Sequence, residues 1–581
     1  MIGGYQMRLG RAKLDSEAAL AGAMTFTRTL ADQIDLSPAL YSTICPVEIA
    51  DRQFAILCTD KALGSGELEE VVRALHKRGY RPADGIPPNL FVTSVPVLVL
   101  SVSKGHITGQ DLLQRKKVQG NSAESTLWKN FVDIVGWAIQ ENASDIHMNI
   151  VDLAERSQIK FHIDGQYVGP ERFIMPTSVL TQMAQVVFQQ SRGGNGPKFQ
   201  PLVEQQCRIF LEVENNNRRE SVMLRWASMA TDDGPQITLR GLRLDAQANV
   251  STLESLGYLP SQRAQIERVQ MSLGGAIIAT GVLGSGKTTL LATLMNNVKG
   301  NRKKISIEDP REYVLPGTHQ NTVVRTLDSD DDGAYRAKVR TLKRAAVNDF
   351  MLGEIRDKQT GAVFQDMLEA GINVYTTVHE RRHFRIPGRL AGQSIGVDRG
   401  VLATPANLKL LIAQVLLPVN CPECSISVKD VLSSKVSGFD AVWFADYFKR
   451  IERLFSLEPT GMRLRNPMGC QHCRRDGLPE LAGYRGRIVA AELLEPDDTL
   501  LELVRDSRNI ELEHYVDSMP RAALDNPNAD NKSALEVAMY HVKCGTVDPR
   551  MVEPRFEAFE TLELRRIRSA SKARTGLKVV G

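Results

Sequence analysis

The sequence has no apolar run long enough to cross a membrane. Its most apolar stretch, Phe91–Val102, is broken by polar residues and a proline, and it is shorter than the ~20 residues that a spanning helix needs. Residues Met1–Asp15 lack the apolar segment of a secretory signal. From these two absences we expect a soluble, cytoplasmic protein.

A strong charge of either sign is also missing. The chain has 72 basic and 68 acidic residues among 581, and only 6% of its residues are aromatic. A groove for nucleic acid needs clustered basic residues interleaved with aromatic side chains, which this composition does not indicate. We therefore expect no direct nucleic-acid partner. The length predicts several domains.

The eight cysteines are not spaced as a disulfide framework. Four of them form two C-x-x-C pairs, Cys421 with Cys424 and Cys470 with Cys473. Each pair can present two thiolates from one tight turn, and four thiolates complete the tetrahedral coordination of Zn²⁺. Because no coordination position would stay open, we predict a structural zinc site.

The strongest motif is Gly281-Val-Leu-Gly-Ser-Gly-Lys-Thr288, which fits the P-loop pattern G-x-x-x-x-G-K-[ST]. A glycine-rich turn lets backbone N–H groups face phosphate oxygens, and the helix that follows adds its positive end. Lys287 is predicted to reach the β- and γ-phosphates of ATP, and Thr288 to hold Mg²⁺. The predicted nucleotide-binding residues are Gly281, Gly284, Ser285, Gly286, Lys287, Thr288 and Thr289.

Strands alternate with helices from Leu253 onward, which is typical of a mostly parallel sheet in an α/β nucleotide-binding core. The predicted strands are Gly275–Thr280, Lys304–Ile307, Phe350–Leu352 and Asn373–Val378, and the predicted helices are Lys287–Val298, Asp331–Ala345 and Thr360–Ala370. Such a sheet binds ligands at the carboxyl ends of its strands. Glu308 and Glu354 follow two of these strands, and we predict that one of them orients the attacking water.

The residues before this core predict a smaller domain that contains a sheet. A helical pattern over Ser125–Gln140 precedes several strand-like pieces, among them Gln158–Gly165 with its Asp-Gly turn. Residues up to Lys117 contain no site-like cluster, and we interpret them as an adaptor domain.

Three more strings follow the P-loop in order: Ile307-Glu-Asp-Pro310, Gly353-Glu-Ile-Arg-Asp357 and Thr376-Thr-Val-His379. They resemble the Asp box, Walker B and His box of the secretion ATPase superfamily that drives type II secretion and type IV pili. The family's second N-terminal domain is similar to this sequence around Ala143-Ser-Asp-Ile-His147 and Phe161-His-Ile-Asp-Gly165, and its C-terminal helical domain around Gly483-Tyr-Arg-Gly-Arg487 and Glu492-Leu-Leu494.

The resemblance implies a homohexameric ATPase that turns hydrolysis into domain motion. It places His379 near the γ-phosphate and assigns phosphate contacts to arginines of the second N-terminal domain. The family's Arg-Phe-Arg is replaced here by Lys160 and His162. Arg208, Arg225 and Arg240 match strand arginines of the family better, and of these we choose Arg225 and Arg240 as the candidates. The implied cofactors are ATP, Mg²⁺ and Zn²⁺. The implied partner is an inner-membrane platform or cytoplasmic docking protein of a pilus or secretion machine, which would hold the chain at the inner membrane.

The predicted fold is α/β, with a RecA-like P-loop core. The predicted domains are an adaptor or docking domain (1–117), a PAS-like second N-terminal domain (118–245), the ATPase core (246–410), a tetracysteine zinc subdomain (411–480), a C-terminal helical region (481–545) and a basic, flexible tail (546–581).

Two other interpretations of the motifs are weaker, and two alternative functions stay open. His379-Glu-Arg-Arg-His383 fits the zinc-protease pattern H-E-x-x-H, but the strand-like residues before it and Pro387 after it leave little room for the required helix. Asp328–Gly333 starts like a calcium loop, but Val339 stands where the last ligand should be a glutamate. A DNA-transfer motor and a nucleotide-binding scaffold without efficient turnover remain as alternative functions.

Overall fold

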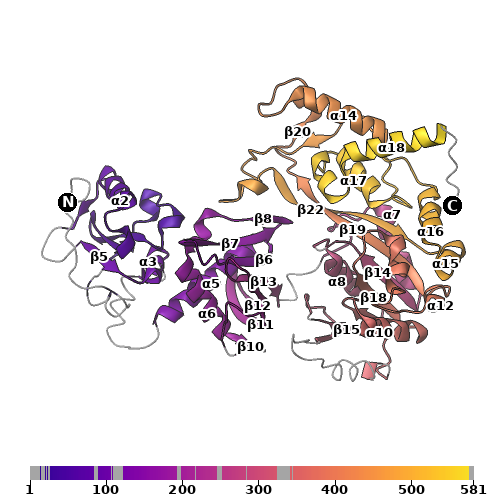
Figure 1. The fold of residues 1–581 in the computed structure, drawn as a ribbon, viewed down its shortest axis with the longest axis horizontal. Coiled ribbons are helices and arrows are strands. Elements are labelled where there is room, and N and C mark those ends of the chain that lie inside the picture. Colours follow the sequence, from indigo (N-terminus) through magenta and orange to yellow (C-terminus); the bar gives the residue numbers. More distant parts are fainter. Residues whose placement is uncertain are drawn as a thin grey trace. The chain divides into compact units, whose positions relative to one another are not determined.

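The structure is a computed structural model that describes residues 14, 20, 23, 26–83, 89–105, 107–108, 122–192, 196, 198–215, 218–244, 251–282, 284–309, 311–322, 341–342 and 344–574. The chain forms two compact units, Met1–Leu244 and Asp245–Gly581. Figure 1 colours the first unit indigo to magenta and the second magenta to yellow. Among the described residues, no helix has both the length and the apolar character needed to cross a membrane.

The first part of unit 1 is a small mixed sheet in the order β1-β2-β3-β4, with β5 paired to β3. Its elements are β1 (Arg28–Thr29), β2 (Ile44–Ala50), β3 (Gln53–Thr59), α2 (Gly66–Lys77), β4 (Arg81–Pro82), β5 (Leu90–Thr93) and α3 (Pro96–Ser103). The apolar stretch Phe91–Val102 is thus a strand followed by a buried helix. Pro96 starts the helix because a first-turn residue needs no N–H partner.

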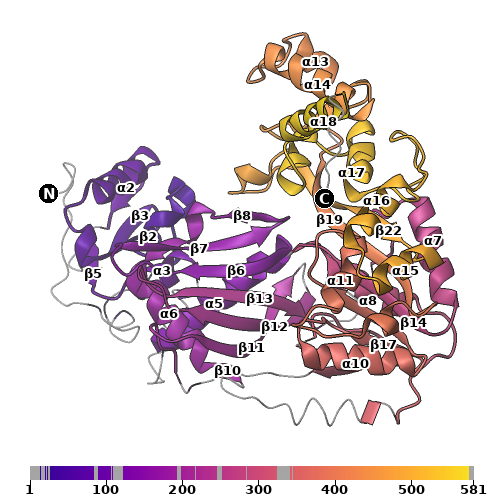
Figure 2. The ribbon, with the colours of Figure 1, turned by 45° about the vertical axis from the view of Figure 1, so that its right-hand side comes forward.

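The second part of unit 1 is a larger sheet in the order β10-β11-β12-β13-β6-β7-β8, with β9 paired to β7 (Figure 2). Its elements are α5 (Ser122–Gln140), β6 (Ala143–Asn149), β7 (Arg156–Ile163), β8 (Gln166–Val168), β9 (Ile174–Pro176), α6 (Thr177–Gln189), β10 (Ser191–Arg192), β11 (Gln205–Asn215), β12 (Arg218–Met229) and β13 (Gln236–Arg243). Helices α5 and α6 pack on this sheet. Buried and more exposed residues alternate along β7 and β11, so the two faces of the sheet differ.

Unit 2 is built on a seven-stranded sheet in the order β16-β15-β17-β18-β14-β19-β22. All neighbouring pairs are parallel except β19 with β22. The strands are β14 (Gly275–Thr280), β15 (Lys304–Glu308), β16 (Thr318–Thr322), β17 (Asp349–Leu352), β18 (Asn373–Val378), β19 (Leu408–Asn420) and β22 (Tyr484–Leu494). The helices of the core are α7 (Pro260–Met271), α8 (Lys287–Asn297), α10 (Lys358–Glu369), α11 (Ile386–Leu390) and α12 (Arg399–Leu402).

Both faces of β14 are buried, which explains the continuous apolar sequence of this strand. Ala276 and Ile278 of β14 belong to the core on one face, and Ile277 and Ala279 belong to the core on the other. Each of the four predicted strands of the core coincides with an observed one to within a residue. Most of the predicted helix Asp331–Ala345 and the calcium-like loop lie outside the described residues.

The C-terminal part combines two predicted regions in one core. Its elements are β20 (Ile426–Ser427), α13 (Val428–Leu432), α14 (Ala441–Phe455), β21 (Arg463–Leu464), α15 (Asp498–Arg505), α16 (Asn509–Ser518), α17 (Ala534–Lys543) and α18 (Phe559–Arg574). Residues of α14, α17 and the start of α18 share a single hydrophobic cluster. The predicted boundary between residues 410 and 411 falls inside β19, because that strand continues from the core sheet to the first cysteine pair.

Part of the tail that we predicted to be flexible (546–581) is a helix in the structure. This helix, α18, packs against α14 (Figure 1). Phe559 is fully buried, and Glu563 pairs with Arg450 at 3.0 Å and Arg453 at 2.6 Å. The basic composition of the segment hid these contacts. One buried aromatic residue and one acidic residue anchor the helix.

Candidate functional site

The P-loop has the backbone geometry of an anion cradle. Gly281 has φ 146°, and a Cβ there would stand 2.4 Å from the carbonyl oxygen of Gln414, so only glycine fits. Helix α8 begins after Gly286, which has φ 81° and contributes no side-chain cap. The hydroxyl of Ser285 is buried and has no hydrogen-bond partner among the described residues. The loop therefore keeps donors available for phosphate oxygens at a helix N-terminus, and it fits a nucleotide.

Lys287 lies folded over its own loop. Its Nζ donates to the carbonyl oxygens of Gly281 at 2.9 Å and Val282 at 3.1 Å. Burial lowers the pKa of this amine, and the nearby carboxylates of Glu354 and Glu312 oppose that shift. Exchanging two carbonyl oxygens for phosphate oxygens would give this buried cation a stronger partner.

Glu354 and His379 meet at the carboxyl ends of two neighbouring parallel strands, β17 and β18. His379 Nε2 lies 3.0 Å from Glu354 Oε1. The side chain of Glu354 is 34% exposed and adds to the charge around Lys287. The structure thus brings the Walker B-like carboxylate, the histidine and the P-loop lysine into one neighbourhood.

The residues after Glu354 organise the surrounding backbone. Arg356 pairs with Asp309 at 2.5 Å and so links this loop to the end of β15. Asp357 caps α10 by accepting from the N–H of Thr360 at 2.9 Å. Within Gly353–Asp357, Glu354 is thus the acidic group that faces the site, while Arg356 and Asp357 bind the loop to the end of β15 and to the start of α10.

Glu308 has a different environment from Glu354. It is buried, and its Oε1 accepts from Ser306 Oγ at 2.6 Å and from Gln320 Nε2 at 3.1 Å. Burial raises the pKa of its carboxyl, and these two donors lower it in part. Of the two predicted carboxylates, Glu354 is the more accessible to an attacking water.

The sequence patterns missed several residues that support the P-loop. Gln414 Nε2 donates to the carbonyl oxygen of Ser285 at 2.6 Å, and the hydroxyl of Tyr258 donates to Gln414 Oε1. Tyr313 and Thr289 share a hydroxyl–hydroxyl hydrogen bond of 2.7 Å. The one available signal was Gln414 itself, because it is a buried polar residue in the middle of a long apolar run, with Leu410–Ala413 before it and Val415–Leu417 after it.

The candidate arginines lie in unit 1 and form a row across three strands. Arg208, Arg225 and Arg240 are direct partners in register on β11, β12 and β13, so their side chains share one face of the sheet. Arg240 Nε pairs with Asp145 Oδ1 at 2.9 Å. In the same sheet, His162, one of the two replaced arginine positions, lies with its Nδ1 2.8 Å from Nε2 of His147.

The four cysteines of the two C-x-x-C pairs converge on one point. Their sulfur atoms all lie within 4.8 Å of one another, with separations of 3.8 Å for Cys421–Cys470 and 3.7 Å for Cys424–Cys473. A tetrahedron with metal–sulfur bonds of ~2.3 Å has edges of about 3.8 Å. The donor set and its dimensions therefore fit a closed zinc site.

Two backbone N–H groups favour the thiolate form of Cys473, which is the form that binds a metal. Burial alone would raise the pKa of Cys473, but the N–H groups of Cys470 and Gly483 donate to its sulfur, and the pKa falls to about 7. Gly483 has φ 83°, and a Cβ there would stand 2.1 Å from the carbonyl oxygen of Asn466. Only glycine can therefore come this close to the backbone of Asn466 while its N–H donates to the Cys473 sulfur.

The zinc-protease pattern is not realised. His379 lies in the loop after β18, whereas His383 is buried at the start of the short 3-10 helix His383–Arg385. The two histidines therefore do not share the face of one α-helix, which that chemistry requires.

Comparison with known proteins extends these observations. The family model described as "Type II/IV secretion system protein" matches residues 121–535, which is more than half of the chain. The chain is 27% identical over 380 residues to the type II secretion system protein E of Pseudomonas aeruginosa, and the match covers 64% of this chain and 66% of that protein. It is also 27% identical over 387 residues to the type IV pilus assembly ATPase TfpB of Acinetobacter baylyi, covering 66% of this chain and 59% of the relative.

Solved structures are more distant. The ATPase DotB of Legionella pneumophila covers 73% of this chain and 95% of its own length, at 18% identity and a TM-score of 0.45. The pilus retraction motor PilT with bound ADP covers 74% and 98%, at 18% identity and a TM-score of 0.42. The family model, whose match includes the P-loop and the Glu354–His379 pair, decides the assignment. The chain belongs to the family of type II/IV secretion system proteins.

Proposed function

We propose that this protein is an ATPase that works as a homohexameric ring on the cytoplasmic side of a pilus-assembly or type II-like secretion machine. The observation that carries the proposal is the contact between Glu354 and His379 close to the P-loop lysine Lys287, in a loop whose Ser285 hydroxyl has no hydrogen-bond partner among the described residues. The names of two relatives, a type II secretion system ATPase and a type IV pilus assembly ATPase, support ATP as the substrate and secretion or pilus assembly as its use.

Each residue has a chemical task in this proposal. The P-loop N–H groups and Lys287 bind the β- and γ-phosphates, and Glu354 accepts a hydrogen bond from the attacking water and orients it. His379 holds Glu354 in place and senses the γ-phosphate. Thr288 would hold Mg²⁺, which neutralises phosphate charge when bound. Arg225 and Arg240 supply further cations when the two units close around the nucleotide.

The function is tested by measuring ATP binding and phosphate release on one preparation of the full chain. We expect tight binding of ATP together with steady release of phosphate. A chain that binds ATP without releasing phosphate would be a nucleotide-binding scaffold instead. Stimulation by DNA would favour a DNA-transfer motor. The proposed partner, an inner-membrane platform or docking protein, is tested by cross-linking in cells through residues 1–117.

The cysteine cluster leads to a prediction about metal. The purified protein should carry about one zinc per chain, and Cys421→Ser should lower both the zinc content and the melting temperature, the latter by roughly 5–10 °C, because the closed site stabilises its subdomain. The matched control is Cys544→Ser, since Cys544 is exposed and outside the cluster. Metal analysis that finds no zinc in protein prepared without chelator would contradict the prediction.

A further inference from the structure

The loop that follows β18 carries His379 and is fastened to the strand that leads into the P-loop. The hydroxyl of Thr280 accepts from the N–H of Glu380 at 2.7 Å and lies 2.9 Å from the carbonyl oxygens of Val378 and Glu380. Thr280 is the last residue of β14, directly before Gly281. One side of the loop is therefore fixed relative to the phosphate cradle.

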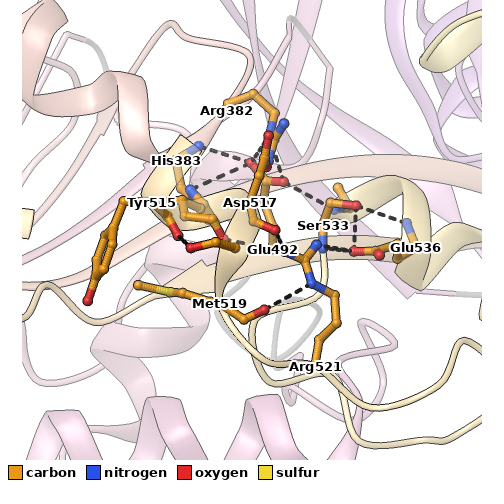
Figure 3. A network of polar contacts seen from close by, with 12 residues as sticks. Arg382, His383, Glu492, Tyr515, Asp517, Met519, Arg521, Ser533 and Glu536 are labelled. Carbon is orange, nitrogen blue, oxygen red and sulfur yellow. Dashed lines mark hydrogen bonds and ion pairs between the residues drawn. The ribbon is translucent and has the colours of Figure 1, made fainter. Parts of the chain in front are cut away.

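A single buried carboxylate holds the other side of this loop (Figure 3). Glu492 on β22 is 1% exposed. Arg382 Nε lies 2.9 Å and 3.0 Å from its two oxygens, and the N–H of His383 donates to Oε1 at 3.0 Å. Burial alone would raise the pKa of Glu492, but His383, Arg382 and the backbone donors hold the pKa below its usual value. The carboxylate is therefore ionised and bound to the loop.

The same carboxylate also holds the start of a C-terminal helix. Its Oε2 accepts from the N–H of Ala534 at 3.2 Å, the first residue of α17. Ser533 and Glu536 form the capping box of that helix, and Arg521 pairs with Glu536 at 3.0 Å (Figure 3). Helix α17 in turn shares its hydrophobic core with α14 of the cysteine subdomain. Glu492 thus joins the His379 loop to the C-terminal helices.

We propose that Glu492 is a positioning residue for ATP hydrolysis, which sets the place of His379 against Glu354 and couples that place to α17 and the cysteine subdomain. The inference rests on the proposed function. Only two residues separate His379 from Arg382, and the path between their Cα atoms is at most about 10 Å even when extended, so a shift of Arg382 moves the histidine. The mechanical output of the ring would pass through this carboxylate.

Glu492→Gln keeps the size of the side chain and removes its charge. We expect kcat to fall ~10–100-fold while the KM for ATP changes less than about twofold, because the loss is one of geometry at His379 rather than of phosphate binding. The matched control is Glu495→Gln, which makes the same change just beyond the end of β22, at a carboxylate whose contacts are with Arg268 and Gln265 of α7 rather than with the loop. It should leave kcat within about twofold of the wild type.

A double-mutant cycle separates positioning from general stability. In a His379→Ala background, Glu492→Gln should lower kcat by less than about twofold, because its effect runs through the missing imidazole. If the fold-loss of kcat in the double variant equals the product of the losses in the two single variants, the inference is wrong. If Glu492→Gln does not fold, Arg382→Gln takes its place in the cycle, since Glu492 then keeps its two backbone donors. If the wild type hydrolyses ATP and the two substitutions lower kcat independently, this inference is wrong and the proposed function stands. If the wild type does not hydrolyse ATP, the proposed function itself is wrong.

Discussion

Lys287→Ala should lower ATP hydrolysis by about 10³-fold and weaken ATP binding as well. The structure has this amine buried over the P-loop, where its partners are two backbone carbonyl oxygens. Its removal leaves the developing charge on the γ-phosphate without the P-loop cation, and such preorganised groups supply most of the rate in phosphoryl transfer. Phosphate release and nucleotide affinity are measured together. Glu354→Gln should differ by keeping ATP affinity while losing turnover.

The matched control for this change is Lys299→Ala. Lys299 is exposed just beyond the end of α8, so the variant has the same change in net charge and lies close to the same helix. It should hydrolyse ATP like the wild type. Phosphate release at the wild-type rate from Lys287→Ala would refute the nucleotide site.

Arg225→Ala should lower kcat by about 10³-fold with ATP affinity almost unchanged. Arg225 lies in unit 1, with Arg208 and Arg240 in register on either side, while the P-loop lies in unit 2. A cation that reaches the phosphates only when the units close stabilises the transition state and contributes little to ground-state binding. Arginines that act in this way are worth ~10³–10⁵ in rate.

Arg219→Ala is the control for the arginine row, because Arg219 is an exposed residue of the same strand. It should keep full activity. If Arg225→Ala weakens ATP binding and leaves kcat unchanged, the arginine contributes to ground-state affinity and the closure mechanism is wrong. Arg240 is a less sharp test, since its loss also leaves the buried Asp145 without its partner.

The core of the fold could be predicted because its strands have simple local signatures. Gly275–Thr280 and Asn373–Val378 are short runs rich in β-branched or apolar residues that are buried along their whole length, and each ends at a turn. Strand β19 was not predicted, because it passes from the core sheet into the cysteine subdomain and so has no turn signal at the expected boundary. Helix α18 was missed since a basic sequence hides its few anchoring contacts.

The motif residues of the candidate site could be predicted from the sequence, but the residues that hold them in place through hydrogen bonds could not. Glu354 and His379 are recognisable along the sequence, and parallel pairing of β17 and β18 brings them together. The roles of Gln414 and Glu492 depend on contacts with residues more than a hundred positions away. What the sequence does show is a polar residue inside a buried strand, and such a residue must find a partner.

The central claim is that chains of this protein hydrolyse ATP as an assembled ring. It is tested most directly by the rate of phosphate release per chain, measured over a range of protein concentrations with the oligomeric state followed by sedimentation. The rate per chain should rise in step with the fraction of hexamer, because in the proposed mechanism the ring is what brings Arg225 to the nucleotide. A dilute preparation that is strictly monomeric and releases phosphate at the same rate per chain would contradict the claim.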